Sequence, residues 1–317
     1  MDFYVGVTDK CWFDFLRQEP REDVNFWKPL GGGKNFGAVP SGAPFLLKLK
    51  KPFHCIAGAG FFTNQIDLPI FTAWEMFGPR NGFGDYFDFA QAIRKYRAAN
   101  GKPAEANPVI SCLVLTAPLF FRQPDWIPAP ESWGNSIVTG KVYNTSEAVG
   151  GQLWADVSAT MLRYRQDSLT QELATTDSLV LESPGIYREA LTKVRVGQGA
   201  FKAMVTQAYE KKCAISGEKT LPVLEAAHIQ PFSQAGPNSL GNGLLLRSDL
   251  HRLFDRHYLT IDADDRTVHV SSRIREEFQN GKEYYQFDGK PLKVLPKLLA
   301  DQPAKQYLQH HNGLFMP

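Results

Sequence analysis

The chain has 317 residues, of which 43% are hydrophobic and 21% charged, and its formal net charge is +2. This composition excludes a disordered, collagen-like or coiled-coil protein, and the length exceeds the roughly 250 to 300 residues at which a single hydrophobic core stops growing, so two domains are expected. No stretch approaches the roughly 18 apolar residues of a membrane span, and the first residues lack the pattern of a signal peptide. We therefore expect a cytoplasmic protein without a membrane partner.

The first 160 residues predict a β-rich domain, because Gly and Pro repeatedly interrupt the apolar runs. The candidate strands cover residues 3–7, 45–49, 54–62, 109–116 and 136–142. Gly58 and Gly60, within the third of these strands, indicate a bulge or a close approach of another backbone segment. Five of the six tryptophans precede residue 150, which concentrates large aromatic side chains in this half.

Residues 161–184 are predicted to form a linker with helical parts. The segment 154–165 has helical spacing of its apolar residues, and a polar stretch and a Pro-Gly pair follow it. A C-terminal domain is then expected at residues 185–317, beginning with two short helices at 186–191 and 198–209.

An ordered series of polar residues marks the C-terminal half, which contains six of the seven histidines. His228 lies at the end of an apolar segment, Leu-Glu-Ala-Ala-His-Ile, that predicts a strand. A long polar loop leads to Asn242, and the segment Asp-Leu-His-Arg-Leu-Phe-Asp around His251 predicts a helix. A β-loop-α unit is therefore expected here, followed by a strand at 258–262.

These residues resemble the HNH endonuclease family, whose ββα-metal site is named for a His, an Asn and a His in this order. The resemblance covers roughly residues 195–262 and includes the eight residues that separate Asn242 from His251. It implies a nuclease domain that hydrolyses phosphodiester bonds with one metal ion. By resemblance, His228 is the general base that activates water, Asn242 holds the loop and orients that base, and His251 binds the metal.

Further ligands follow from the same resemblance. Asp255 lies four residues after His251 on the same helical face and is expected to join the metal site or its water shell. Many family members carry Asp or His directly before the base, whereas this chain has Ala227, and Glu225 shares a strand face with it and is expected to supply a carboxylate. The expected ion is Mg²⁺ or Mn²⁺. No structural zinc is predicted, because only Cys213 stands where some members have paired cysteines.

Basic residues outnumber acidic ones around this series: residues 185–260 contain ten Lys or Arg and six Asp or Glu. A local excess of positive charge attracts phosphates even when the net charge of the chain is small. The candidates for DNA contacts are Arg195, Gln198, Arg247 and Arg252. Arginines of this kind are also common as solvated surface charges, and both interpretations stay open.

The first half resembles the PUA superfamily, closest to its EVE branch, over residues 1–156. The resemblance rests on the first strand, Tyr-Val-Gly-Val-Thr, on Asn-Phe-Trp-Lys-Pro around Trp27, and on the segments 45–62 and 135–143. It implies a small β-barrel that flips a modified base into an aromatic pocket, where stacking offsets an extrusion cost of about a few kcal/mol. The pocket candidates are Asn25, Trp27, Phe62 and Trp74, although aromatic side chains in a barrel more often form the core.

The expected fold class is α+β, with a PUA/EVE-like β-barrel at residues 1–160, a helical linker and a ββα-metal nuclease domain. This combination resembles the modification-dependent (type IV) restriction endonucleases of prokaryotes. It implies double-stranded DNA with modified bases, in particular modified cytosine, as partner, a role in phage defence, and a chain that could act as a homodimer.

Two alternatives stay open. The first half could be a dimerisation or inhibitory module of an HNH nuclease. The chain could also be a non-catalytic reader of modified nucleic acid, which Ala227 favours and the intact His228, Asn242 and His251 oppose.

Overall fold

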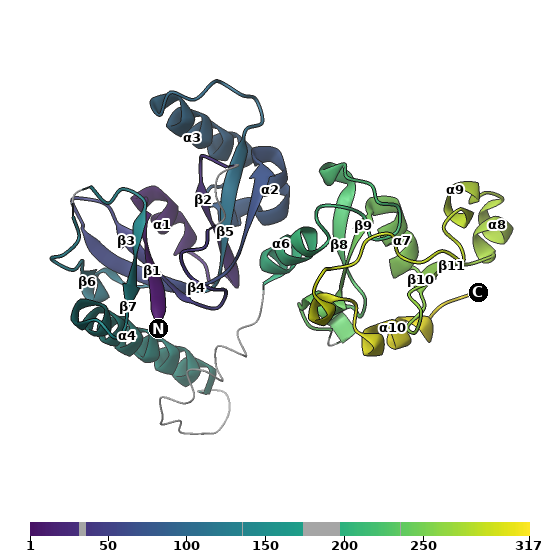
Figure 1. Ribbon diagram of the computed structural model, residues 1–317. Helices are drawn as coiled ribbons and strands as arrows, with labels where there is room; N and C mark the ends of the chain where they lie inside the picture. Colours follow the sequence, from purple (N-terminus) through teal and green to yellow (C-terminus); the bar gives the residue numbers. More distant parts are fainter. Residues whose placement is uncertain (32–35, 135, 174–196, 235) are drawn as a thin grey trace. The chain divides into compact units, whose positions relative to one another are not determined.

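The computed structural model describes residues 1–31, 36–134, 136–173, 197–234 and 236–317. The chain divides into two compact units, Met1–Val196 and Gly197–Pro317. Each unit contains both helices and strands, which confirms the predicted α+β class (Figure 1). Part of the linker predicted at 161–184 lies in a helix, and the rest lies outside the described residues, as does the helix predicted at 186–191.

A seven-stranded mixed sheet forms the centre of the N-terminal unit. Its strand order is β2-β5-β4-β3-β1-β7, and β6 pairs with β4. Strand β1 runs parallel to β3, and the other pairs are antiparallel. The strands are β1 Asp2–Thr8, β2 Asp23–Lys28, β3 Pro44–Leu49, β4 Cys55–Pro69, β5 Val109–Phe120, β6 Ile127–Pro128 and β7 Gly140–Asn144.

Strand β4 is longer than the sequence predicts, because it continues past Phe62 beside β5. The pairing of β4 with β5 shifts register around Gly60 and again after Phe62. A Cβ atom at Gly58 would lie 2.5 Å from the carbonyl oxygen of Leu119. The predicted bulge and close backbone approach are thus both confirmed.

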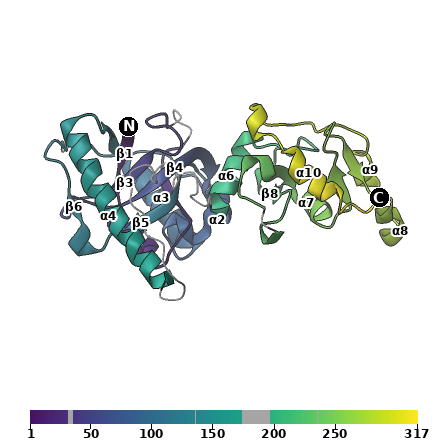
Figure 2. The same ribbon diagram turned by 90° about the horizontal axis from the view of Figure 1, so that it is seen from below.

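Both faces of the sheet are buried. Side chains alternate along β1, so Tyr4 enters a core with Trp12, whereas Phe3 enters a second core with Val157. Helix α1 covers the first core and α4 the second, and Figure 2 shows α4 crossing the strands. The helices of this unit are α1 Lys10–Leu16, α2 Ile70–Phe77, α3 Tyr86–Ala99 and α4 Ala148–Leu173, with 3₁₀ turns at Gly78–Asn81 and Gln123–Asp125.

The C-terminal unit is organised around a ββα element. Strands β8 (Leu224–His228) and β9 (Gly243–Arg247) are antiparallel, helix α7 (Ser248–Asp255) follows β9 directly, and α6 (Gln198–Ala208) packs against both strands. The remaining elements are β10 Leu259–Ile261, β11 Val268–Val270, α8 Arg273–Phe278, α9 Lys282–Tyr285 and α10 Lys305–Asn312, with 3₁₀ turns at Leu221–Val223, Phe232–Gln234, Leu240–Asn242 and Leu299–Asp301. Within the described residues of the whole chain, no helix is both long and apolar enough to cross a membrane.

Candidate functional site

The ββα element brings the polar residues of the sequence series together. His228 is the last residue of β8 and pairs with Gly243, the first residue of β9. Asn242 directly precedes β9, and His251 lies in the first turn of α7. These residues of one short segment therefore lie close together, because β8 and β9 pair and α7 begins where β9 ends.

Two side chains hold the imidazole of His228. Its ring stacks on Phe201 of α6, with the ring centroids 4.0 Å apart and 13° between the planes. Its Nε2 lies 2.7 Å from Oδ1 of Asn238 in the loop between β8 and β9. Because an amide oxygen only accepts hydrogen bonds, Nε2 carries the proton and Nδ1 is the basic nitrogen.

The environment of His228 favours the neutral imidazole. Burial lowers the pKa of His228 below its usual value, the hydrogen bond to Asn238 offsets part of this effect, and the charge of His251 adds to it. At neutral pH the ring is therefore uncharged and able to accept a proton.

Asn242 is fully buried and closes the loop that follows His228. Its Oδ1 accepts from the backbone N–H of Gln230 at 2.9 Å, and its Nδ2 donates to the carbonyl oxygens of Gln230 and Pro237, each at 3.0 Å. The side chain of Asn242 thus binds backbone on both sides of the loop, and these bonds do not include the imidazole itself.

His251 lies between two carboxylates. Its Nδ1 is 2.7 Å from Oε2 of Glu225 on β8, and its Nε2 is 3.3 Å from Oδ2 of Asp255. Burial alone would lower the pKa of His251, but the hydrogen bonds and charges of Asp255 and Glu225 outweigh it and raise the pKa. The two carboxylates therefore create a negative potential that favours a cation at this position.

These three side chains suit a hard divalent cation. One imidazole and two carboxylates supply the nitrogen and oxygen donors that Mg²⁺ or Mn²⁺ accepts, and the Glu225 and Asp255 side chains are 47% and 54% exposed, which gives access to an ion and its waters. Ala227 is fully buried and offers no donor. In the part of the chain that the structure describes, no group of three or more His, Cys, Asp or Glu is placed so that it could hold a metal ion, so these three side chains would have to rearrange to bind one. Since both ring nitrogens of His251 are engaged, metal binding requires it to give up one carboxylate contact.

The residues predicted to contact DNA differ in their surroundings. Gln198, the first residue of α6, and Arg252 in α7 are exposed. The guanidinium of Arg247 donates to both carboxylate oxygens of Asp249, at 2.6 and 2.8 Å, so its charge is largely compensated. Arg195 lies outside the described residues.

Cys213, considered above for zinc, lies buried in the turn that follows α6. Its Sγ accepts hydrogen bonds from the backbone N–H groups of Ser216 and Arg247, at 3.4 and 3.3 Å. The thiol thus connects this turn to the end of β9.

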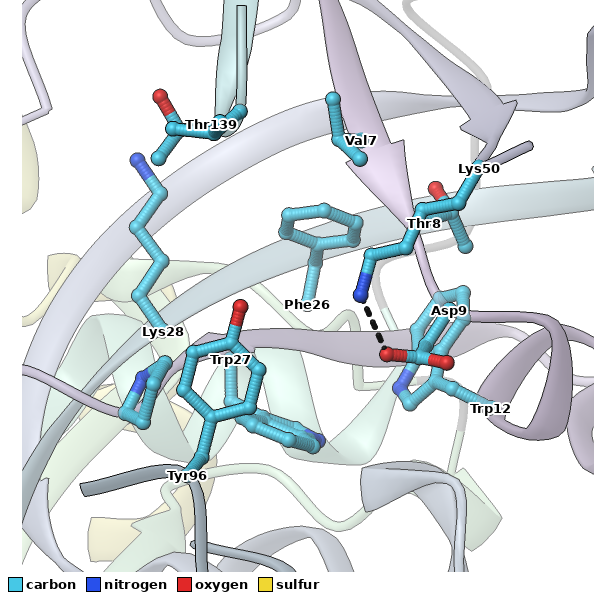
Figure 3. A pocket seen from close by; sticks show the side chains of 12 residues that line it. Val7, Thr8, Asp9, Trp12, Phe26, Trp27, Lys28, Lys50, Tyr96 and Thr139 are labelled. Atoms are coloured by element: carbon cyan, nitrogen blue, oxygen red, sulfur yellow. Dashed lines mark hydrogen bonds and ion pairs between the residues drawn. The ribbon is translucent and has the colours of Figure 1, made fainter. Parts of the chain in front are cut away.

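The N-terminal unit contains a cavity of about 110 Å³, and four of the twelve residues that line it are aromatic. Figure 3 shows Trp12, Phe26, Trp27 and Tyr96 around one space, with Lys28 and Lys50 at its edge. The residues that line it are Val7, Thr8, Asp9, Trp12, Phe26, Trp27, Lys28, Pro29, Lys50, Tyr96, Val138 and Thr139.

Polar groups of this cavity are only partly satisfied. Lys50 Nζ forms an ion pair with Asp9 at 2.7 Å, and burial lowers the pKa of Lys28. The indole N–H of Trp27 donates to the carbonyl oxygen of Asn81 at 2.9 Å. The buried indole N–H of Trp12 has no hydrogen-bond partner among the described residues, which costs free energy until an acceptor reaches it.

Of the four predicted pocket residues, Trp27 lines this cavity and the other three do not. Asn25 is fully buried, and its Nδ2 donates to Oδ1 of Asn81 at 2.8 Å. Phe62 belongs to the core of the sheet. Trp74 lies in an aromatic cluster of the α2 and α3 region, with ring centroids 5.9 Å from Phe89.

Comparisons with known proteins complete this description. Residues 213–262 match the family model of HNH endonucleases. An ASCH protein from Zymomonas mobilis, solved in a mutant form, is similar at 9% identity over 49% of this chain and 96% of that chain, with a TM-score of 0.34. The modification-dependent TagI restriction endonuclease is similar at 12% identity over 99% of this chain and 81% of that chain, with a TM-score of 0.28. No match is found among curated proteins.

The family match contains His228, Asn242 and His251 in the order that the family requires. The C-terminal unit therefore contains an HNH endonuclease domain, and the chain is a metal-dependent DNA nuclease. Two contacts of this domain have no counterpart in the predicted site: Phe201 against the His228 ring and Asn238 at its Nε2. Asn238 lies in an irregular polar loop, where no periodicity indicates which side chain turns inward.

Proposed function

We propose that this nuclease depends on DNA modification: it binds a modified base, in particular modified cytosine, extruded from double-stranded DNA, and hydrolyses phosphodiester bonds at the HNH site. The observation that carries the proposal is an aromatic cavity in the N-terminal unit, which the nuclease chemistry itself does not use. A flipped base needs stacking partners and hydrogen-bond partners in a confined space. The cavity provides both.

At the HNH site, His228 removes the proton of the attacking water through Nδ1, because Nε2 is already protonated. Asn242 holds the loop on which this geometry depends. His251, Glu225 and Asp255 would hold the divalent ion. When bound, Mg²⁺ or Mn²⁺ supplies positive charge for the phosphate and the leaving oxygen.

Phosphate contacts are assigned to exposed side chains near this site. Gln198 and Arg252 are accessible, and Arg195 lies two residues before Gly197 in the sequence, outside the described residues. Arg247 is assigned a weaker contribution because Asp249 already compensates its charge. Phosphate contacts of this kind give affinity without base specificity, so discrimination must come from the other unit.

In the cavity, Trp27 and Tyr96 are proposed to stack on the extruded base. Asp9 offers an acceptor for an exocyclic amino group, and the Trp12 N–H, buried beside Gly82 in the free protein, would become a donor for a ring nitrogen or carbonyl oxygen if the base uncovers it. The pairing edge of cytosine carries one amino donor and two acceptors, which fits these two groups. The apolar aromatic surface around them would bury an added methyl group.

Cleavage of matched duplexes tests the proposal. Otherwise identical DNAs with cytosine, 5-methylcytosine, 5-hydroxymethylcytosine or N6-methyladenine are incubated with the full chain and Mg²⁺ or Mn²⁺, and with a chelator as control. We expect preferential cleavage of a cytosine-modified duplex and none with the chelator. Equal cleavage of all four would favour a dimerisation or inhibitory role for the first half. Selective binding of a modified duplex, with no cleavage in the presence of Mg²⁺ or Mn²⁺, would favour a non-catalytic reader.

A further inference from the structure

We infer that Asn238 is a positioning residue for the general base: its side-chain oxygen holds the His228 imidazole in the tautomer protonated at Nε2, which leaves Nδ1 to take the proton of water. The catalytic part of this role rests on the proposed function, in which His228 is the base. The structural part rests on the contact of 2.7 Å between His228 Nε2 and Asn238 Oδ1.

Asn238 is held in place by the same network that closes the loop. Asn242 Nδ2 donates to the carbonyl oxygen of Pro237, the residue directly before Asn238, at 3.0 Å. The backbone N–H of Ser239, directly after it, donates to the same carbonyl oxygen at 2.9 Å. Buried Asn242 therefore acts on the imidazole indirectly, through Pro237 and Asn238, which gives a physical path for the orientation that the family resemblance assigns to it.

Phe201 and Asn238 restrict different motions of the imidazole. Stacking on Phe201 fixes the plane of the ring but permits a half-turn about the Cβ–Cγ bond, which exchanges the positions of Nε2 and Cε1. The hydrogen bond from Nε2 to Asn238 fixes this rotation and the tautomer together. Phe201 packs closely against β9, since a Cβ atom at Gly243 would lie only 3.1 Å from its ring.

Asn238 is an uncharged hydrogen-bond partner, which suits the role of His228 as a base. The charged or titratable groups that influence His228 are Lys202 on α6 and His251 and Asp255 on α7. An amide oxygen selects the tautomer without adding another negative charge, so the imidazole stays neutral and ready to accept a proton. A carboxylate at 238 would select the same tautomer but would stabilise the protonated ring.

The tautomer can be measured without any cleavage assay. In the full chain labelled with ¹⁵N, the ¹H–¹⁵N correlations of the imidazoles distinguish protonated from unprotonated nitrogens, and comparison with His228→Gln identifies the signals of His228. We expect a single Nε2-protonated form in the parent chain and a mixture of both tautomers in Asn238→Ala. An Asn238→Ala spectrum with the same single tautomer would overturn the role.

Cleavage then tests the catalytic consequence. Asn238→Ala should cut turnover about 10- to 100-fold, a loss of the size seen when the hydrogen-bond partner that orients a metal-ligating histidine is removed. Its requirement for Mg²⁺ or Mn²⁺ should stay unchanged, since the side chains proposed to hold the ion are Glu225, His251 and Asp255. Ser239→Ala, in the same loop, is the matched control and should cleave normally.

Asn238→Asp separates positioning from folding. It keeps the acceptor, so most of the turnover should return, while the acidic limb of the pH–rate profile moves to higher pH. A folded Asn238→Asp chain as inactive as Asn238→Ala, or an undiminished Asn238→Ala, would overturn the positioning role. If the parent chain cleaves no DNA while the tautomer result holds, the proposed function fails and the structural role of Asn238 stands.

Discussion

The two candidate sites of this chain are built in opposite ways. The nuclease site takes its polar side chains from one short segment, residues 225–255, and joins them through a single ββα element. The N-terminal cavity takes its walls from β1, α1, β2 and α3 and from residues near β3 and β7, scattered between Val7 and Thr139. Hence the residues of the first site are brought together by one local element, whereas the second site depends on how a whole sheet is assembled.

The largest expected effect is the loss of the general base. His228→Ala should reduce cleavage by about 10² to 10⁴, the range that general base catalysis contributes, because Nδ1 no longer accepts the water proton. DNA binding by the same variant should stay close to normal. Steady-state cleavage and a binding titration measure the two quantities.

His269→Ala is the matched control, because His269 is an exposed histidine on β11 of the same unit. It should cleave like the parent chain. Undiminished cleavage by His228→Ala, or an equal loss in both variants, would contradict the assignment of His228 as the general base. The ββα element would then not be the chemical site that we contrast with the N-terminal cavity.

Sequence alone predicts that the residues of the proposed nuclease site lie close together, because the geometry of this segment is local. His228, Asn242 and His251 owe their proximity to one strand pair and the helix that follows. The contact from Asn238 to His228 escapes prediction because it depends on the course of an irregular loop. In the first half, the strands are recognisable from apolar runs, but which side of the sheet each aromatic ring faces depends on register and bulges. Phe62 and Trp27 both pack in the first core, yet only Trp27 also lines the cavity.

The second prediction concerns acid stability, which should differ between the two units. His311 is buried, stacks on Phe254 with centroids 3.7 Å apart, and donates from Nε2 to the Phe254 carbonyl oxygen at 3.0 Å. Burial lowers the pKa of His311 to about 4, below the value of about 6.5 in the unfolded chain. The unfolded chain therefore binds more protons between these values, and the C-terminal unit loses stability as pH falls from 6.5 toward 4, by about 3 kcal/mol in total.

Calorimetry of the full chain at pH 7 and pH 5 measures this loss. His311→Gln can still donate to Phe254 and accept from Thr260 but cannot titrate, so its unfolding transition should shift less between the two pH values. An equal shift in the variant would assign the acid sensitivity to other groups.

The third prediction tests whether the aromatic cavity recognises the base. Trp27→Ala should weaken binding of modified DNA by about 1 to 3 kcal/mol, the usual contribution of a base stacked on an aromatic ring. It should also lower the melting temperature, because Trp27 packs against the core and donates to Asn81. Binding is therefore measured well below the transition, on the folded fraction.

Trp74→Ala is the matched control, since Trp74 packs on Phe89 outside the cavity. It should lower the melting temperature and leave the binding of folded protein unchanged. If the two variants bind modified DNA equally well after correction for unfolded protein, Trp27 is a core residue only. The cavity would then not recognise the base through Trp27.

The smallest expected effect concerns a single hydrogen-bond donor, the indole N–H of Trp12. The Trp12 N–H is buried and has no partner among the described residues, so in the free protein it contributes a cost rather than a bond. If an extruded base supplies an acceptor, Trp12→Phe should weaken binding of modified DNA about 2- to 10-fold, the equivalent of one ordinary hydrogen bond. The variant should lose little stability, because removing an unsatisfied donor offsets part of the packing lost with the larger ring.

Trp133→Phe makes the same change in the core on the other face of the sheet, away from the cavity, and should leave binding unaltered. Equal affinities in these two variants would mean that no ligand atom reaches the Trp12 donor, and would leave stacking as the contribution of the cavity.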